Sequence, residues 1–404
     1  MRRGVARGGP GVIAAALAKR TAACAAIVAA LAGCTNATSS SVSITGKTLT
    51  IYASAPSQTA DPVRAQDVLD AERLALNQNG SQVGSYQVRF IRLAGTSISG
   101  NARTAIQDTS AIAYLGEVDP GASADSIPIT NDQDILQVSS TDNALEYTQS
   151  TPAVPDSPKK YYAEAYSSHG YTFARVVPSS ALEAQAQVQE LQALHVRKLY
   201  VADDGSEYGA ALAYAVRTDA ARVLTVQQGP ANAASVRSSG ADSLFFGSQS
   251  PAVAARLFNA AAATVPSLKL LGPSALDNDS FASVLGANAR PDVDISAPGF
   301  LPAELTASGR KFVSDFKAAY GHLPAPGAIF GYEAMSAVLA VLHGAGSSAG
   351  NRSTVVHDFR AIKNRSSVLG TYSIQNGDTT LGAFVFSRFK AGVLVPFKFV
   401  QAQG

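Results

Sequence analysis

The stretch TLTIYA at residues 48–53, followed by VRAQDVLDAERLALN at residues 63–77, sets the pattern of this chain. The first run is short and rich in β-branched and aromatic residues, whereas the second repeats alanine, valine and leucine at helical spacing. A strand followed by a long helix is the first half of a βαβ unit, in which the helix returns the chain to a parallel strand. The pattern therefore predicts an α/β fold.

The same alternation continues to about residue 343 and changes near the C-terminus. Further strands are expected at residues 86–93, 111–115, 134–138, 198–202, 222–226, 243–246 and 269–271. Helices are expected at residues 101–109, 210–218, 252–263, 303–320 and 330–343, with another ending near residue 194. Residues 371–375, 383–388 and 393–400, joined by Asn376-Gly377-Asp378 and Lys390-Ala391-Gly392, predict consecutive antiparallel strands with tight turns. A chain of this length exceeds what one core usually supports, which favours two lobes.

The N-terminus has the features of a lipoprotein signal. Five basic residues precede an apolar run that ends in Leu31-Ala32-Gly33-Cys34. A basic start, a short apolar segment and small residues before the cleavage site are typical of a signal peptide. We expect residues 1–33 to be removed, Cys34 to carry the lipid anchor, and residues 34–46 to form a flexible tether. A short transmembrane helix is the alternative, but the polar residues that follow favour a tether.

Charge and residue content argue against several classes of function. The formal charge is +2, and removing the five basic residues of the signal makes it −3. A positively charged surface that binds nucleic acid is therefore not expected. Cys24 leaves with the signal and Cys34 is the anchor, so the mature chain has no thiol for a disulfide, a nucleophile or a metal site. The five histidines are scattered without a metal-ligand spacing. Neither a metal nor a cofactor is expected.

Several short motifs occur in a characteristic order. They are Tyr114-Leu115-Gly116, Ile135-Leu136-Gln137-Val138-Ser139-Ser140-Thr141, Phe173-Ala174-Arg175, Asp203-Asp204-Gly205-Ser206-Glu207-Tyr208-Gly209, Leu271-Gly272-Pro273-Ser274-Ala275-Leu276, Gly331-Tyr332-Glu333-Ala334-Met335, and the run from Leu369 to Asp378. In this order the chain resembles the type I periplasmic solute-binding proteins, specifically the Leu/Ile/Val-binding branch of ABC-transporter receptors. The resemblance covers nearly all of the mature chain.

The resemblance implies two doubly wound parallel-sheet lobes joined by three crossings, with the ligand cleft between them. Carried over to this chain, lobe one spans residues 47–175 plus 300–366. Lobe two spans residues 176–299 plus 367–404. A cleft in this place also follows from the fold, because turns after parallel strands gather at one edge of a sheet.

The resemblance also assigns candidate ligand contacts. Ser139, Ser140 and Thr141 match the turn whose hydroxyls and backbone amides hold the carboxylate of the ligand. Such a turn also caps a following helix, and both interpretations remain open. Tyr208 matches the tyrosine that covers the ligand from lobe two, although an aromatic residue at a helix start is also ordinary packing.

An α-amino acid would need an anion for its ammonium group. Glu117, Asp142 and Asp277 are the candidates for that anion. Ala275, Leu276 and Phe300 are candidates for an apolar wall, although residues of this type more often belong to a core.

Two segments depart from the family pattern. Pro120-Gly121 stands where relatives have a Ser-Gly turn, and residues 55–62 replace a Ser-Gly-Pro turn at the cleft rim. The ligand of leucine-binding relatives therefore cannot simply be copied to this chain.

We therefore expect a solute-binding receptor of an ABC importer that takes a small polar solute, such as an amino acid or amide. It would be lipid-anchored on the outer face of the cell membrane or the periplasmic side, and would dock on the ABC permease subunits. The alternatives are a ligand-sensing subunit of a signalling system and a cleft hydrolase, either an esterase or an amidase. Residues 346–350 match G-x-S-x-G but follow a helix instead of a strand, so a nucleophile elbow and an enzyme are not expected.

Overall fold

The structure is a computed structural model that describes residues 42–162 and 170–403. The chain divides into two units, residues 1–40 and 41–404, and the second unit is described here by itself. The predicted signal peptide, the lipid anchor at Cys34 and most of the predicted tether lie outside the described residues.

The first lobe is built on a sheet with the strand order β2-β3-β1-β4-β5-β6. Its strands are β1 (Thr48–Ser54), β2 (Gln82–Val83), β3 (Tyr86–Leu93), β4 (Ala111–Leu115), β5 (Leu136–Ser139) and β6 (Phe173–Arg175). All neighbours pair in parallel except the short edge strand β2. The chain winds outward from β1 first to one side and then to the other, which makes the sheet doubly wound.

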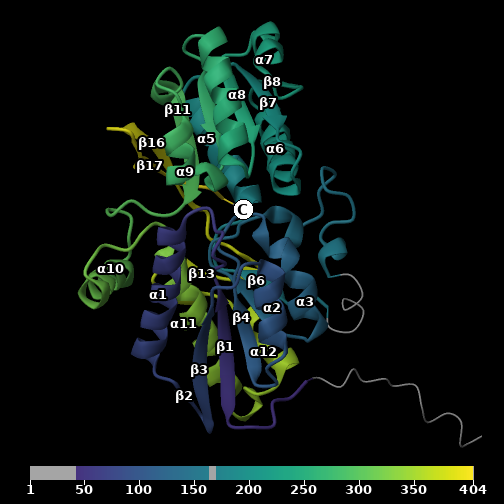
Figure 1. Cartoon of the computed structure of the whole chain (residues 1–404), viewed down its shortest axis with the longest axis vertical. Helices are drawn as coiled ribbons and strands as arrows, with labels where there is room; N and C mark the ends of the chain where they lie inside the picture. The colour runs from purple at the N-terminus through teal and green to yellow at the C-terminus, as the bar shows by residue number, and fades with distance from the viewer. Residues whose placement is uncertain (1–41, 163–169, 404) are drawn as a thin grey trace, which may run out of the picture. The chain divides into compact units, whose positions relative to one another are not determined.

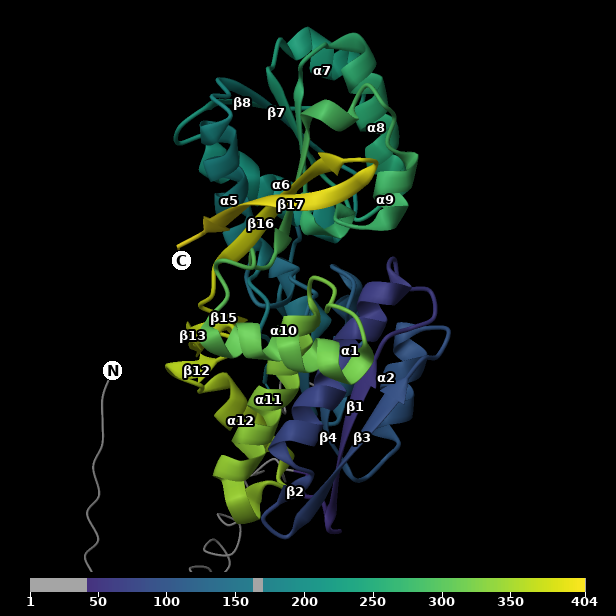
Figure 2. The ribbon, with the colours of Figure 1, turned by 90° about the vertical axis from the view of Figure 1, so that its left-hand side faces the viewer.

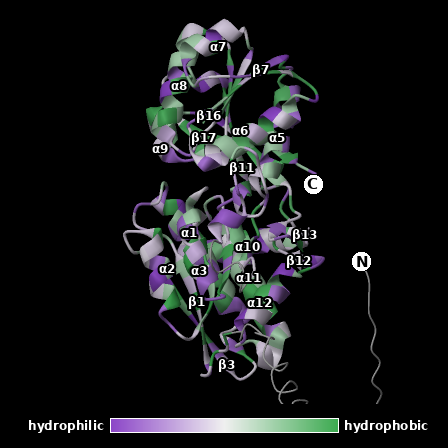
Figure 3. Cartoon of the chain, turned by 90° about the vertical axis from the view of Figure 1, so that its right-hand side faces the viewer, coloured by the Kyte–Doolittle hydropathy of each residue, from purple (hydrophilic) through white to green (hydrophobic). Residues whose placement is uncertain are grey.

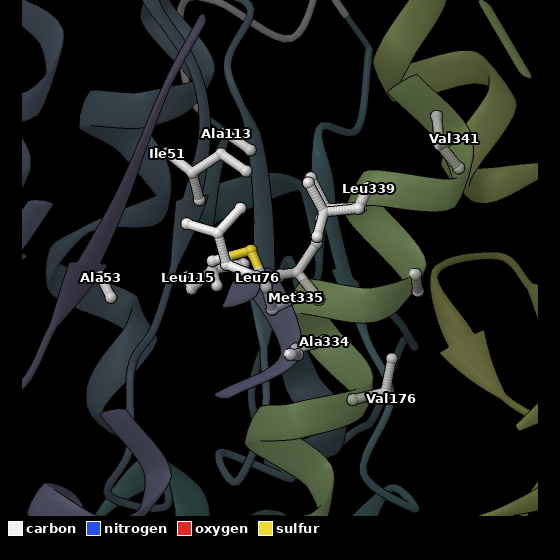
Figure 4. Packing of buried hydrophobic residues seen from close by; sticks show 14 of the residues in the cluster. Ile51, Ala53, Leu76, Ala113, Leu115, Val176, Ala334, Met335, Leu339 and Val341 are labelled. Carbon is white, nitrogen blue, oxygen red and sulfur yellow. The ribbon is translucent and has the colours of Figure 1, made fainter. Parts of the chain in front are cut away.

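Helices cover both faces of the first sheet (Figure 1). They are α1 (Pro62–Asn79), α2 (Ile98–Ile106), α3 (Ile127–Asp132), α11 (Ala328–Ala345) and α12 (Arg352–Arg360). Helix α10 (Ala307–Tyr320) packs on the outside of α1 and α11. Alternate side chains of β1 explain this arrangement, since Ile51 faces the core under α1 and α11 while Tyr52 faces a smaller core under α2. Figure 4 shows Ile51, Leu76 and Met335 meeting in the larger core.

The second lobe contains a sheet with the order β17-β16-β11-β10-β9-β7-β8. Its strands are β7 (Lys198–Asp203), β8 (Thr225–Gln228), β9 (Ser243–Gly247), β10 (Lys269–Gly272), β11 (Val293–Pro298), β16 (Ala383–Lys390) and β17 (Val393–Gln401). The five strands from β8 to β11 in this order are parallel, and β16 and β17 are antiparallel. Its helices are α5 (Ser180–Ala193), α6 (Glu207–Ala220), α7 (Ala233–Ser239), α8 (Pro251–Thr264) and α9 (Asp279–Val284).

Two cores lie on the two faces of the second sheet. Val201 and Phe245 pack toward α5 and α6, whereas Tyr200 and Phe246 pack toward α8 and α9. Figure 3 shows hydrophobic and hydrophilic residues mixed along the helices of both lobes, as expected where one helix face packs on a sheet. These observations confirm the predicted α/β class with two sheets dominated by parallel strands.

The described chain passes between the two sheets three times, after β6, after β11 and after the short strand β15 (Asp378–Thr379). The first and third crossings are tied together. The backbone N–H of Arg175 donates to the Gly377 carbonyl at 2.8 Å, and its buried guanidinium pairs with Asp378 at 2.9 Å. The first and third crossings are therefore bonded to each other where the chain passes between the two lobes.

The C-terminal strands differ from the predicted antiparallel series. Strands β12 (Arg365–Ser367) and β13 (Gly370–Tyr372) pair with each other, and β14 (Ile374–Gln375) pairs with β15. Leu369, Tyr372 and Ile374 lie in the core of the first lobe, whereas the family resemblance placed residues 367–404 in the second lobe. Figure 2 shows β16 and β17 (yellow) in the second lobe, whereas β12, β13 and β15 lie in the first.

The end of the predicted tether is part of the fold. Ile44 donates its backbone N–H to Gly350 at 2.8 Å and is buried, and Arg352 donates to the Val42 carbonyl at 3.0 Å. The predicted end of the tether at residue 46 is therefore too late by a few residues. Residues 42–46 include the apolar Val42 and Ile44, but the docking of Ile44 depends on a distant turn that local patterns do not reveal.

Candidate functional site: a cleft between the lobes

A cavity of about 100 Å³ lies between the two lobes. Its lining residues are Thr59, Ala60, Asp61, Arg64, Ala65, Val68, Val118, Asp119, Pro120, Thr141, Val177, Ser274, Ala275, Asp277, Asn278, Ala297, Pro298, Pro326, Gly327 and Phe330. Many of them follow the carboxyl ends of strands, as Thr59 follows β1, Val118 follows β4 and Ser274 follows β10. A cavity needs about 10–15 Å³ to hold one water, so this space admits several waters or a small solute.

Among the described residues that line the cavity, Arg64 is the only one with a positive charge. Asp61 caps α1 by accepting the Arg64 backbone N–H at 3.0 Å, and its carboxylate lies 3.2 Å from Arg64 Nε. Arg64 Nη1 also donates to Asp277 Oδ2 at 2.9 Å. Burial by itself would lower the pKa of Arg64, but the Asp277 carboxylate raises it, so the guanidinium stays charged. The cavity is thus crossed by an ion pair from the first lobe to the second.

Asp119 fixes the loop that follows β1. Its Oδ1 accepts from the Thr59 hydroxyl at 2.9 Å, and its Oδ2 accepts from the Ala60 backbone N–H at 3.1 Å. Burial raises the pKa of Asp119, and these two hydrogen bonds oppose part of that effect. The carboxyl therefore closes one rim of the cavity while remaining bound to its own lobe.

The remaining wall is mostly apolar. Val68 and Phe330 come from the first lobe, Ala275 and Ala297 come from the second, and Val177 comes from the first crossing. Phe330 stacks on Phe300, with ring centroids 6.2 Å apart and an interplanar angle of 29°. Phe300, which the sequence suggested as wall, stands behind Phe330 and does not line the cavity. Apolar walls with a few placed polar groups are typical of small-molecule sites.

The predicted hydroxyl turn is used mainly inside the first lobe. Ser139 donates to the Glu117 carbonyl at 3.0 Å and accepts from the Asp142 N–H at 2.8 Å. Ser140 is buried, and its Oγ has no hydrogen-bond partner among the described residues. Thr141 lines the cavity, but its hydroxyl donates to the Val118 carbonyl at 2.6 Å. The turn is thus a structural support of the cavity, with one member on its surface.

Two of the three predicted anions point into the first lobe. Glu117 accepts from Ser54 at 2.8 Å and from Tyr114 at 2.7 Å, and burial raises its pKa to about 8. Asp142 accepts from the backbone N–H groups of Gly121 and Ser123 at 2.8 and 2.7 Å. Neither residue lines the cavity. Of the three candidates, Asp277 alone does so.

Tyr208 lies beside the cavity instead of on its surface. It is 1% exposed and packs in the core of the second lobe, at the start of α6. Its hydroxyl lies 3.1 Å from the Ser274 hydroxyl, and Ser274 does line the cavity. Leu276 is likewise a core residue, whereas Ala275 is part of the wall. Contact of Tyr208 with a solute stays a prediction. In this structure Tyr208 contacts Ser274 of the cavity wall from behind.

Arg64, Asp119 and Phe330 line the cavity but were not among the predicted ligand contacts. The loop at residues 55–62 was identified as the cleft rim, and Arg64 follows it by two positions, but an arginine in the first turn of a helix usually faces solvent.

Ser348, in the G-x-S-x-G string, lies in a 3₁₀ turn after α11 and not at the cavity. Among the described residues, no group of three or more histidine, cysteine or acidic side chains is placed to hold a metal ion.

Solved structures are similar to this chain across most of its length. A leucine-binding protein from Thermotoga maritima has a TM-score of 0.71 and 17% identity, over 87% of this chain and 99% of that one. A branched-chain amino acid transporter substrate-binding protein from Streptococcus pneumoniae, in complex with isoleucine, has a TM-score of 0.65 and 14% identity, over 88% and 100%. A solute-binding protein of an ABC transporter from Rhodopseudomonas palustris, in complex with benzoate, has a TM-score of 0.63 and 15% identity, over 88% and 97%.

No family profile and no curated protein matches the sequence. At the identities of the solved structures, the likeness shows the fold, which is that of the type I periplasmic binding proteins.

Proposed function

We propose that this protein is the extracytoplasmic solute-binding receptor of an ABC importer. The observation that carries the proposal is the cavity at the edge where the strand ends of both sheets meet, lined by both lobes. Of the solved proteins named above, one is a solute-binding protein of an ABC transporter, one is a substrate-binding protein of a branched-chain amino acid transporter, and one is a leucine-binding protein. A site shared between two lobes suits a receptor, because the solute itself can hold the lobes together.

Contacts between the lobes support a hinged mechanism. Arg64 pairs with Asp277, and the Ser280 hydroxyl donates to the Ala60 carbonyl at 3.3 Å on the same side of the cleft. On another side, Gly121 of the first lobe packs so closely against Tyr208 of the second that a Cβ added to Gly121 would lie 3.2 Å from Tyr208 Cβ. A solute that touches both lobes shifts the population toward this closed arrangement, which the permease would recognise.

The cavity suits a small polar solute with an apolar body, such as an amino acid or amide. The apolar wall around Phe330 and Val68 would bury the body, and Arg64 and Asp277 would orient its polar end. Each step is a binding event or a movement of the lobes, and no bond is made or broken in the solute.

The sequence of residues 1–34 supports the location. A signal peptide ending in Leu31-Ala32-Gly33-Cys34 would export the chain and leave a lipid on Cys34, on the outer face of the cell membrane or the periplasmic side. The partners would then be the ABC permease subunits in that membrane. A lipid anchor keeps the receptor near the permease without a membrane-spanning helix.

A thermal-shift screen tests this function. The purified protein is heated with amino acids, amides, amines and small carboxylates, because a solute that binds only the folded state raises the melting temperature. At a concentration 100 times its dissociation constant, such a solute adds about 2.7 kcal/mol to the free energy of unfolding. The proposal expects one class of solute to give a saturable rise. A screen without any such rise, together with native mass spectrometry that finds no small molecule on protein isolated from its host, would refute the proposal.

A further inference from the structure

The charged groups around the cavity are mostly acidic. Arg64 is positive, whereas Asp61, Asp119 and Asp277 are carboxylic acids, and all four line the cavity. Burial raises the pKa of Asp119 and so favours its neutral form. Even with Asp119 neutral, the two carboxylates paired with Arg64 outnumber it. The cavity therefore offers an incoming anion no net positive charge.

Arg64 is already engaged by both of its carboxylate neighbours. Asp61 lies 3.2 Å from its Nε, and Asp277 lies 2.9 Å from its Nη1. A solute carboxylate that approached this guanidinium would meet two like charges at close range, which is unfavourable. In this arrangement Arg64 neutralises the protein's own acids and is a poor anion receptor.

The hydroxyl groups nearest to the cavity have no free proton for an anion. Among the lining hydroxyls, that of Thr141 donates its single proton to the Val118 carbonyl, and those of Thr59 and Ser274 donate to the carboxyl groups of Asp119 and Glu183. The Ser139 hydroxyl, which lies outside the lining, donates to the Glu117 carbonyl. Ser140 does not line the cavity. The family resemblance implied that this turn holds a carboxylate, but its side-chain donors are used within the first lobe.

Asp277, by contrast, has an unused acceptor. The residue is 4% exposed and lines the cavity, and its Oδ2 accepts from Arg64. No residue in the described ranges donates a hydrogen bond to its Oδ1. This oxygen is not among the buried atoms that lack a hydrogen-bond partner, so it is open to the cavity and free to accept an N–H group from a solute.

We propose that the cavity takes a small amine cation with an apolar body, that Asp277 Oδ1 accepts its N–H group, and that a solute whose only charge is a carboxylate is rejected. This inference rests on the receptor function proposed above and names the class of its solute. The apolar wall of Val68, Ala275 and Phe330 would hold the body of the amine.

Three solutes of nearly equal shape test the inference. Leucine carries both charges, 3-methylbutylamine is leucine without its carboxylate, and 4-methylpentanoate is leucine without its amine. Titration calorimetry at pH 7 should give at least tenfold tighter binding of the amine than of the carboxylate. Asp277→Asn should weaken amine binding at least tenfold. Asp315→Asn removes a surface carboxylate that pairs with Lys311 on α10, and should leave amine binding unchanged.

If the apolar part of these solutes does not fit the cavity, weak binding would conceal the preference for a positive charge. The comparison is therefore repeated with butylamine against butyrate and with benzylamine against benzoate. Tighter binding of a carboxylate in any pair, or amine binding that Asp277→Asn leaves unchanged, would overturn the inference. So would the absence of amine binding in all pairs. If another class of solute then raises the melting temperature in the screen, the receptor function stands while the amine inference falls.

Discussion

Arg64 and Asp277 are 213 positions apart in the sequence, yet Arg64 Nη1 lies 2.9 Å from Asp277 Oδ2. Arg64 belongs to α1 of the first lobe, and Asp277 follows the short turn after β10 of the second. The pair can exist only while the lobes are together. It therefore contributes to the closed state and is lost on opening.

Asp277→Asn should shift the solute-free protein toward an open arrangement. The Arg64 side chain is 30% exposed, so solvent screens the pair, and pairs of this kind contribute about 0.2–1 kcal/mol. Small-angle X-ray scattering should give a larger radius of gyration for this variant than for the wild type. Asp315→Asn, which breaks an exposed pair within α10, should scatter like the wild type. Identical curves for all three proteins would mean that the pair has no influence on closure.

Gly121→Ala should weaken solute binding by obstructing closure. Gly121 has φ 84° and ψ 0°, and an added Cβ would lie 2.6 Å from Gln249 Oε1 and 3.2 Å from Tyr208 Cβ. Gly321→Ala is a matched control, because Gly321 has φ 83° and ψ −3° and nothing lies within 4 Å of its added Cβ. Both variants should lose about 1–2 kcal/mol of stability from the left-handed backbone. Only Gly121→Ala should lose affinity, on the order of tenfold by calorimetry, a loss of about 1.4 kcal/mol; equal affinities would argue against the closed contact.

Glu117 should make the protein less stable as the pH rises. Burial raises its pKa to about 8 in the fold, from an ordinary value of 4.5, although hydrogen bonds from Tyr114 and Ser54 oppose this. Between these two pH values the folded state keeps the proton and the unfolded state releases it, so the free energy of unfolding falls by up to about 1.4 kcal/mol per pH unit.

Urea unfolding of Glu117→Gln between pH 5 and 8 checks this slope. Glutamine resembles the protonated acid, so the variant should lose stability less steeply with pH than the wild type. Part of the slope should remain, because burial also raises the pKa of Glu146 to about 8. Replacing the exposed Glu304 with Gln should leave the profile unchanged. A variant with the wild-type slope would show that Glu117 is ionised in the fold.

Substitutions of Tyr208 distinguish a role in covering the ligand from a role in packing the core of the second lobe. A tyrosine that only covers the ligand would lose affinity on truncation but keep its stability. Tyr208 is 1% exposed in the core of the second lobe, so Tyr208→Ala should cost about 3–5 kcal/mol of stability, as for other large core aromatics. Tyr208→Phe removes only the hydroxyl contact to Ser274 and should cost about 1 kcal/mol. Chemical denaturation of the solute-free variants distinguishes the two roles.

Much of the fold could be predicted because its signals are local. The strands expected at residues 86–93 and 111–115 are β3 and β4 with the same bounds, and the helix expected at 252–263 is α8 to within one residue at each end. Strand β11 was not predicted, although it carries one crossing and pairs with β16. Such pairing depends on contacts between distant segments, which residue patterns within one segment do not specify.

The site was harder to predict for a related reason. Thr141 and Asp277 line the cavity, and their contact with a solute stays a prediction. Glu117 and Ser139 are one and two residues from lining positions and face inward. At the end of a strand, a shift of one residue turns a side chain from the cleft to the core. Arg64 acquires its role only through Asp277, so neither residue alone indicates the pair.

A crystal structure of the complex with the tightest-binding solute shows whether the solute is held between the two lobes. We expect one solute molecule in the cavity, in contact with Phe330 of the first lobe and Asp277 of the second. A solute bound to one lobe alone, or elsewhere on the surface with the cavity empty, would contradict it.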